Sequence, residues 1–241
     1  MKTITVASLK GGVGKTTIAI FLAQALSQFG KTLLIDLDPN NNATDYVIPD
    51  DHEKSPDLES LDAYLALTKR KALRQCIIPG EVMDFVPCTL KLHQAEVEMS
   101  QNPGLVLGLR PQMQPLDYDF VVMDTPPRNS SVLQAALYAS DIVLSPLAPV
   151  RWTFQALGYL NEQINSVEEN TGRRPELIAV PSMVTATEKE VMTSAIDAVK
   201  VSLSAISRSA ALKNAIEARR VLKAESKNGL IFADLAKEIA A

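Results

Sequence analysis

The sequence is poor in the residues on which disulfide-rich and metal-binding proteins depend. Its 241 residues include two cysteines and two histidines, and Cys76 and Cys88 lack the Cys-x-x-Cys spacing of metal and redox motifs. We therefore expect no disulfide framework, zinc site or iron–sulfur cluster in this chain. Both cysteines are expected to be reduced thiols, buried or half-buried.

Long apolar runs, internal repeats and low-complexity tracts are also absent. No segment approaches the roughly 18 consecutive apolar residues that a membrane-spanning helix needs, and residues 1–6 resemble a strand rather than a signal peptide. Apolar residues nevertheless make up 46% of the chain, which is enough to bury one sizeable core. We expect a single domain over residues 1–241 and a cytoplasmic location.

The most informative segment that is present reads KGGVGKTT, at residues 10–17, directly after the β-branched run at residues 3–6. Its three glycines let backbone NH groups converge on an anion, because no Cβ blocks the approach. A helix is expected at residues 16–28, and the positive end of its dipole would point at the same anion. The segment predicts a nucleotide phosphate site made of Gly11, Gly12, Val13, Gly14, Lys15, Thr16 and Thr17.

Two residues of this segment carry the chemistry of a phosphate loop. Lys15 is expected to contact the β and γ phosphates, and the Thr16 hydroxyl to bind Mg²⁺. The segment departs from the strict P-loop pattern, since Leu9 stands where that pattern has glycine and Lys10 adds a second lysine at the entrance. The helix that follows has a predicted apolar face of Ile18, Leu22, Ala25, Leu26 and Phe29.

Two further apolar runs end in carboxylates. Residues 32–35 lead into Asp36 and Asp38, and residues 120–123 lead into Asp124. Both runs are β-rich and free of strand breakers, which is typical of buried strands in a parallel sheet. Ligands of such sheets bind at the carboxyl edge, so we expect these three carboxylates, with Thr16, to surround Mg²⁺ beside the phosphates.

The rest of the chain continues the alternation of strands and helices. Strands are predicted at residues 141–147 and 176–180, and helices at 58–67, 152–167 and 230–241, with a turn-rich, exposed excursion at 49–56. This alternation predicts an α/β fold: a mostly parallel, twisted sheet with helices on both faces.

In this order, the segments KGGVGKTT, LLIDLDPNNNAT and FVVMDTPP resemble the ParA/MinD family of deviant-Walker-box ATPases, over residues 1–160. The resemblance implies a P-loop NTPase fold, ATP and Mg²⁺ as ligands, and weak hydrolysis that a partner stimulates. It implies that Lys10 crosses a dimer interface to the partner's nucleotide, that Asp38 orients or activates the attacking water, and that Asp124 holds magnesium. Lys10, Lys15 and Asp38 are thus the candidate catalytic residues.

The sequence departs from the family pattern in one segment. The family usually continues its Asp-x-Asp-Pro segment with Gln and Gly, whereas this chain has Asn40, Asn41 and Asn42. Asparagine tolerates left-handed backbone angles, so we expect the loop to be preserved. The family also wraps the adenine after the strand at 176–180, which makes Pro181 a candidate contact.

The charge of the chain is unevenly distributed. A net charge of −4 and a pI near 5.3 argue against nucleic acid binding, yet residues 200–227 hold seven basic residues against two acidic ones. A solvated helix face alone would explain such a stretch. ParA-like proteins, however, bind DNA without sequence preference through basic residues late in the chain. The candidates here are Arg208, Lys213, Arg219, Arg220 and Lys223.

The favoured interpretation is an ATPase that forms an ATP-sandwich homodimer, binds the nucleoid DNA and positions a plasmid, a chromosome region or a large cargo such as a carboxysome. A ParB-like or cargo adaptor protein would stimulate its hydrolysis. A metabolic ATP-dependent ligase or kinase on the same fold remains an alternative, although such an enzyme has no need of Lys10. A MinD-like ATPase at the membrane is a further alternative, but residues 230–241 carry a single basic residue, Lys237, and predict a helix packed on the core.

Overall fold

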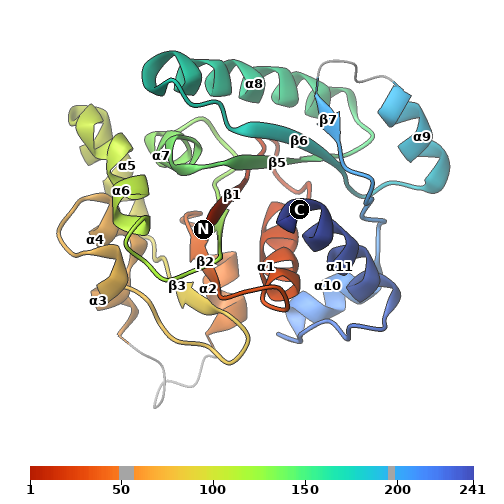
Figure 1. The fold of residues 1–241 in the computed structure, drawn as a ribbon, viewed down its shortest axis with the longest axis horizontal. Coiled ribbons are helices and arrows are strands. Elements are labelled where there is room, and N and C mark those ends of the chain that lie inside the picture. Colours follow the sequence, from red (N-terminus) through yellow and green to blue (C-terminus); the bar gives the residue numbers. More distant parts are fainter. Residues whose placement is uncertain (49–56, 195–198) are drawn as a thin grey trace.

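A parallel sheet of seven strands forms the centre of the protein (Figure 1). The structure is a computed structural model that describes residues 1–48, 57–194 and 199–241, so the predicted excursion at 49–56 lies outside the described residues. The strands are β1 (Lys2–Val6), β2 (Thr32–Asp36), β3 (Asp84–Val86), β4 (Phe120–Asp124), β5 (Ile142–Leu147), β6 (Glu176–Pro181) and β7 (Lys200–Val201). Their order is β3-β2-β4-β1-β5-β6-β7, and all neighbours are parallel, which confirms the predicted fold class.

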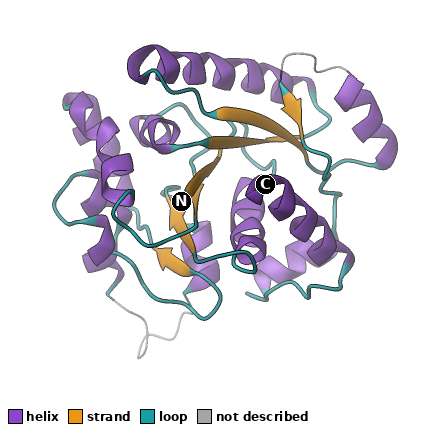
Figure 2. Ribbon diagram, in the orientation of Figure 1, coloured by secondary structure: helices purple, strands orange, loops and turns teal. Residues whose placement is uncertain are grey.

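Helices cover both faces of this sheet (Figure 2). One face carries α1 (Lys15–Leu26), α2 (Asn42–Val47), α10 (Ala210–Glu217) and α11 (Lys227–Ala240). The other carries α4 (Ala63–Leu67), α5 (Leu92–Gln101), α6 (Leu109–Met113), α7 (Ser131–Ala139) and α8 (Arg151–Thr171). The remaining helices are α3 (Leu58–Leu61), α9 (Ala186–Ser194) and the 3₁₀ turns η1 (Leu73–Gln75) and η2 (Pro103–Gly108).

The strands are apolar on both sides because both sides are covered. In β2, Leu34 packs into the cluster that includes α1, while Leu33 and Ile35 pack into the opposite cluster with α4 and α5. All three side chains are fully buried. This is the continuous apolar pattern of a parallel strand between two helix layers, as the sequence predicts.

Helix α1 is buried on nearly all sides, since it lies between the sheet and α11 (Figure 1). Its predicted end at residue 28 and its predicted apolar residue Phe29 are both wrong. The helix ends at Leu26 and continues as a tight turn in which the Phe29 NH donates to the Leu26 carbonyl at 2.8 Å. This turn leaves the Phe29 side chain 47% exposed.

The helix predicted at residues 58–67 is divided into α3 and α4 by Asp62. The backbone of Asp62 is extended (φ −61°, ψ 137°), and the Asp62 carboxylate caps α4 by accepting a hydrogen bond from the Tyr64 NH. The same carboxylate accepts a bond from the Thr89 NH at 2.9 Å. Asp62 thus stabilises the start of α4 as its cap and links it to the segment at Thr89.

The C-terminal helix α11 is packed on the core, as predicted. Phe232, Leu235 and Ile239 are buried, and the Phe232 ring lies 5.5 Å from that of Phe21 in α1. Among the helices of the described residues, none combines the length and the apolar character that spanning a lipid bilayer requires. Cys76 and Cys88 are buried free thiols, also as predicted.

Candidate nucleotide site

Three chain segments meet at the carboxyl edge of the sheet, where β1, β2 and β4 end. The strand register sets Val6 beside Asp124 and Asp124 beside Asp36. The Thr125 hydroxyl donates to the Val6 carbonyl at 2.8 Å, and the Leu37 NH donates to the Asp124 carbonyl at 2.9 Å. The glycine-rich loop and the two acidic segments are thereby brought together, as the sequence predicts.

The glycine-rich loop that follows β1 requires glycine at two positions. Gly12 and Gly14 have φ angles of +72° and +93°, which side chains strongly disfavour. A Cβ on Gly14 would also lie 3.3 Å from the Ser182 hydroxyl, which donates to the Val13 carbonyl at 2.9 Å. The loop is therefore tied to the end of β6, and Gly14 caps the N-terminus of α1, where an anion is stabilised.

Lys15 and Asp124 lie together in the interior of this site. Lys15 is 6% exposed, and burial lowers its pKa, although Asp124 and Asp38 oppose that shift. Asp124 is fully buried; burial raises its pKa, and the neighbouring Asp36 raises it further. In the described part of the chain, neither Asp124 oxygen accepts a hydrogen bond of normal geometry. The Thr16 hydroxyl nevertheless lies close enough to oppose the rise of the Asp124 pKa. Unpaired carboxylate oxygens beside a hydroxyl fit a divalent cation.

Asp36 has a different environment from the one expected for a metal ligand. Its Oδ1 accepts a bond from the Asp38 NH at 3.0 Å, and its Oδ2 accepts bonds from the Thr44 NH and hydroxyl at 2.9 and 2.7 Å. Burial raises its pKa to about 7, against these hydrogen bonds. With both oxygens engaged by its own chain, Asp36 holds the segment from Asp38 to α2 in place, and we do not retain it among the proposed metal ligands.

Asp38 is 4% exposed and lies at the start of the asparagine-rich turn. Its Oδ1 accepts bonds from the Asn40 backbone NH at 3.0 Å and from the Asn40 side-chain amide at 2.9 Å. Asn41 has a φ of +49°, the left-handed conformation that the glycine usual in the family would adopt. Asparagine is the side chain that most readily takes that conformation, so the turn is formed despite the departure in sequence.

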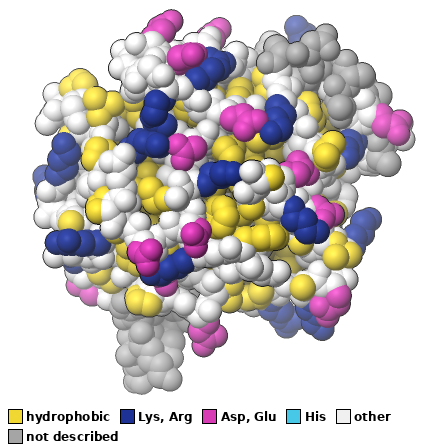
Figure 3. Space-filling model, in the orientation of Figure 1, with side chains coloured by type: hydrophobic (Ala, Val, Ile, Leu, Met, Phe, Trp, Pro, Cys, Tyr) yellow, Lys and Arg dark blue, Asp and Glu magenta, His cyan; other side chains and the backbone are white. Residues whose placement is uncertain are grey.

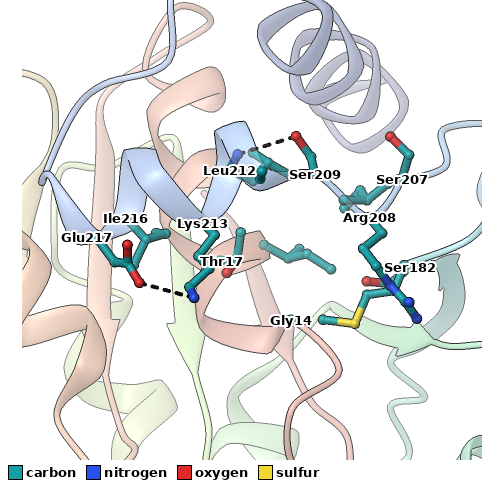
Figure 4. Close-up of a pocket in the computed structure, with 14 residues that line it drawn as sticks. Gly14, Thr17, Ser182, Ser207, Arg208, Ser209, Leu212, Lys213, Ile216 and Glu217 are labelled. Carbon is teal, nitrogen blue, oxygen red and sulfur yellow. Dashed lines mark hydrogen bonds and ion pairs between the residues drawn. The ribbon is translucent and has the colours of Figure 1, made fainter.

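A cavity of 630 Å³ opens beside the glycine-rich loop (Figure 4). Gly14 and Thr17 form its phosphate-loop side, Ser182 and Met183 its β6 side, and residues 206–217 with α10 the remaining wall. Arg208 reaches from the segment before α10 toward Ser182, and Lys213 pairs with Glu217 at 3.5 Å (Figure 4). The sequence gives no signal for this wall, because it is assembled by the tertiary packing of a segment far along the chain.

The candidate adenine and DNA residues lie in three different environments: the core, the cavity and the exposed surface. Pro181 is buried at the end of β6 opposite Leu147 and does not line the cavity, whereas the two residues after it do. Arg208 and Lys213 line the cavity. Arg219, Arg220 and Lys223 are exposed in the turn after α10. Figure 3 shows Lys and Arg side chains at the lower right, the side of the molecule on which Figure 1 places α10.

A second hollow, of 510 Å³, surrounds Lys10. The start of α8 forms much of its lining, which consists of Leu9, Lys10, Trp152, Gln155, Ala156 and Tyr159. The Lys10 side chain is exposed, and Trp152 is 68% exposed. The two lysines of the loop thus have opposite environments: Lys15 is enclosed by its own chain, and Lys10 is exposed to solvent.

The residues that could hold a cation here are few. Thr16, Asp38 and Asp124 lie around the loop, but the described residues contain no group of three or more His, Cys, Asp or Glu side chains close enough to bind a metal by themselves. Such a sparse donor set is typical of Mg²⁺ bound together with a nucleotide, where phosphate oxygens and water complete the coordination.

The parallel sheet with a glycine-rich loop at its carboxyl edge defines a P-loop type of nucleotide-binding protein. The AAA domain family matches residues 1–177. Chromosome partitioning protein ParA of Myxococcus xanthus is 34% identical over 72% of this chain and 61% of its own length. The chromosome-partitioning ATPase Soj of Thermus thermophilus is 30% identical over 75% of this chain and 68% of its own. The chain belongs to the ParA-like branch of deviant-Walker-box ATPases.

Solved structures share the fold. A Cyanothece McdA variant in complex with ATP superposes with a TM-score of 0.84 at 23% identity, covering 99% of this chain and 96% of that one. A plasmid partition protein of Borrelia burgdorferi gives 0.72 at 28% identity, covering 90% and 95%. Cobyrinic acid a,c-diamide synthase of Mycobacterium smegmatis, with ADP and magnesium, gives 0.80 at 23% identity, covering 98% and 93%. The fold is therefore shared by a plasmid partition protein and by a synthase.

Proposed function

We propose that this protein is an Mg²⁺-dependent ATPase that pairs with a second copy of itself when ATP is bound and separates after hydrolysis. The observation that carries the proposal is the contrast between the two lysines of one loop. Lys15 is buried beside Asp124, whereas Lys10 is exposed at the loop entrance. One lysine serves the site of its own chain, and the other is free to reach a nucleotide held by a partner copy.

In this proposal ATP spans the glycine-rich loop and the adjoining cavity. The phosphates lie on the loop from Gly11 to Thr17, and the nucleoside occupies the cavity beside Ser182 and Met183. Thr16 and Asp124 hold Mg²⁺, which neutralises phosphate charge when bound. Asp38 orients the attacking water. Because phosphoryl transfer to water depends on positioning and charge neutralisation, no covalent nucleophile is required.

The dimer is tested by the single tryptophan of the chain. In an Asp38→Ala background with ATP, we expect the emission of Trp152 to shift to the blue as the Lys10 hollow meets a second copy. Lys10→Ala should retain ATP binding but lose both the shift and the dimer in size-exclusion chromatography. Lys31→Ala, which removes an exposed lysine at the opposite edge of the sheet, is the control. A Lys10→Ala protein that dimerises as before contradicts the role of Lys10.

We further propose that the ATP-bound dimer binds DNA without sequence preference and positions a large cargo on the nucleoid. The relatives named above are chromosome and plasmid partition proteins, and McdA shares the fold, which supports this class of activity. Basic residues in the turn after α10 would contact phosphates, and two copies in one dimer would strengthen binding by avidity. A ParB-like or cargo adaptor would stimulate hydrolysis in the cytoplasm.

The DNA-binding surface is assigned by a double substitution. Arg219→Ala with Arg220→Ala should weaken retention of random-sequence DNA and reduce the slope of log affinity against log salt concentration by about two. ATP affinity should not change, because the exposed turn lies outside the lining of the cavity. The control, Lys31→Ala with Arg74→Ala, removes the same charge elsewhere on the surface. Equal DNA retention by both double variants places the surface elsewhere.

One experiment separates the proposal from a metabolic enzyme on the same fold, and the packing of α11 argues against a membrane-positioning ATPase. The likeness to cobyrinic acid a,c-diamide synthase would support a ligase or kinase. A membrane-positioning ATPase would need a free basic amphipathic helix, whereas α11 is packed on α1. We suggest gel shifts on random-sequence DNA with ATP, with ADP and without nucleotide, alongside sizing of the same samples. ATP-dependent dimers that shift DNA support the proposal, and monomers that ignore DNA favour a metabolic enzyme.

A further inference from the structure

Asn40, one of the asparagines that depart from the family pattern, bonds directly to the side chain of Asp38, which is proposed to orient the attacking water. Asn40 donates twice to one oxygen of Asp38, from its backbone NH at 3.0 Å and from its side-chain amide at 2.9 Å. Asn40 itself is exposed, whereas Asp38 is 4% exposed. A carboxylate with so little access to water depends on protein donors for its orientation.

The backbone of Asp38 is already fixed by other contacts. Its NH donates to Asp36 Oδ1 at 3.0 Å, and its carbonyl accepts bonds from the Cys88 thiol at 2.9 Å and from the Asn41 NH at 2.8 Å. Burial raises the pKa of Cys88, so the thiol keeps its proton as a donor. The freedom that remains is rotation of the carboxylate about its own side-chain bonds, and the Asn40 amide restricts that rotation.

The two carboxylate oxygens of Asp38 differ in their contacts. Oδ1 accepts both Asn40 bonds, whereas Oδ2 accepts no hydrogen bond from any part of residues 1–48, 57–194 and 199–241. Some polar atoms in that part of the chain are both fully buried and without a hydrogen-bond partner, and Oδ2 is not one of them. One oxygen is thus anchored and the other is left to accept a hydrogen bond from a water molecule.

We propose that Asn40 is a positioning residue for hydrolysis: it anchors Oδ1 of Asp38 so that Oδ2 is presented to the attacking water. The inference rests on the proposed function, because it requires that Asp38 orient the water. Asn40 acts through Asp38 and not on the nucleotide. Its side-chain bond is charge-assisted, and its loss lets the carboxylate turn away from the reactive position.

The test compares four variants by kcat, KM for ATP, ATP affinity and thermal unfolding. Asn40→Ala should lower kcat about tenfold, since one charge-assisted hydrogen bond is worth roughly 1.4 kcal/mol or more, with ATP affinity and the unfolding temperature unchanged. Asn40→Gln, which supplies the residue usual in the family and keeps the amide donor, should recover most of the lost rate. Asn42→Ala removes a neighbouring exposed asparagine and should behave as the wild type. Asp38→Ala reports on the proposed function separately.

The outcomes test the proposed role of Asp38 and the inference about Asn40 separately. If Asp38→Ala abolishes hydrolysis while Asn40→Ala keeps the wild-type kcat, the inference about Asn40 is wrong and the role of Asp38 stands. If Asn40→Ala lowers ATP affinity and the unfolding temperature together with kcat, or if Asn40→Gln recovers nothing, Asn40 has a merely structural role and the inference is also wrong. If Asp38→Ala hydrolyses ATP normally, the proposed role of Asp38 fails and the inference about Asn40 fails with it.

Discussion

Lys15→Ala is expected to abolish ATP binding. Lys15 is enclosed at 6% exposure beside Asp124, so its ammonium would meet the phosphates in a site with little water to screen the attraction. Removing one partner of such a buried ionic contact costs about 3 kcal/mol or more, which corresponds to a loss of at least about a hundredfold in affinity. The loss should be measured by calorimetric titration with ATP and magnesium.

The fold should survive this substitution. Without Lys15, Asp124 would lose a cation that opposes the rise of its pKa, so it would take up a proton more readily and be buried as a neutral acid. Lys15→Met, which keeps most of the side-chain length, should lose ATP binding to the same extent and show the same unfolding temperature as the wild type without nucleotide. An affinity within about threefold of the wild type for both variants would refute the assignment of the phosphate loop.

Asp38→Ala is expected to bind ATP and stop hydrolysing it. Positioning of a reacting water by a carboxylate contributes on the order of a hundredfold or more to a rate. In the described part of the chain, the hydrogen bonds of the Asp38 carboxylate go to Asn40 and not to the backbone of the glycine-rich loop, so the loop should keep its conformation. ATP would then persist, so the protein should accumulate as a dimer on DNA. Phosphate release and sizing in the same samples measure both effects.

A matched control for this variant is available in the neighbouring turn. Asp45→Ala removes a carboxylate in the first turn of α2. Within the described residues, the Asp45 side chain accepts a hydrogen bond only from the side-chain amide of Asn41. Hydrolysis by this control should be unchanged. Normal hydrolysis by Asp38→Ala would refute the role of Asp38 in orienting water, whatever the state of the dimer.

The glycine-rich loop and the strand and helix beside it could be predicted from the sequence, because their local signals agree. The β-branched run before Lys10, the glycines of the loop and the apolar helix after it each favour the same strand, loop and helix. Asp38 and Asp124 could be placed because parallel strands align their carboxyl ends at one edge. The roles of these residues remain predictions until the variants above are measured.

The parts that could not be predicted depend on contacts between distant segments. Strand β3 has three residues and is stabilised by pairing with β2, so its sequence carries little signal of its own. Asp62, at the break between α3 and α4, bonds to the distant Thr89, and the wall of the cavity beside the glycine-rich loop depends on how α10 packs against the sheet. Charge alone makes Arg208 and Lys213 candidates for DNA contacts, and only the tertiary structure places them in the lining of this cavity.

The most direct test of the central claim is a crystal structure of the Asp38→Ala protein with ATP and Mg²⁺. We expect two copies facing each other across two nucleotides, with Lys10 of each copy in contact with the phosphates held by the other and Trp152 buried between them. Two nucleotide pockets that are each completed by a single chain, with Lys10 in solvent, would contradict the account.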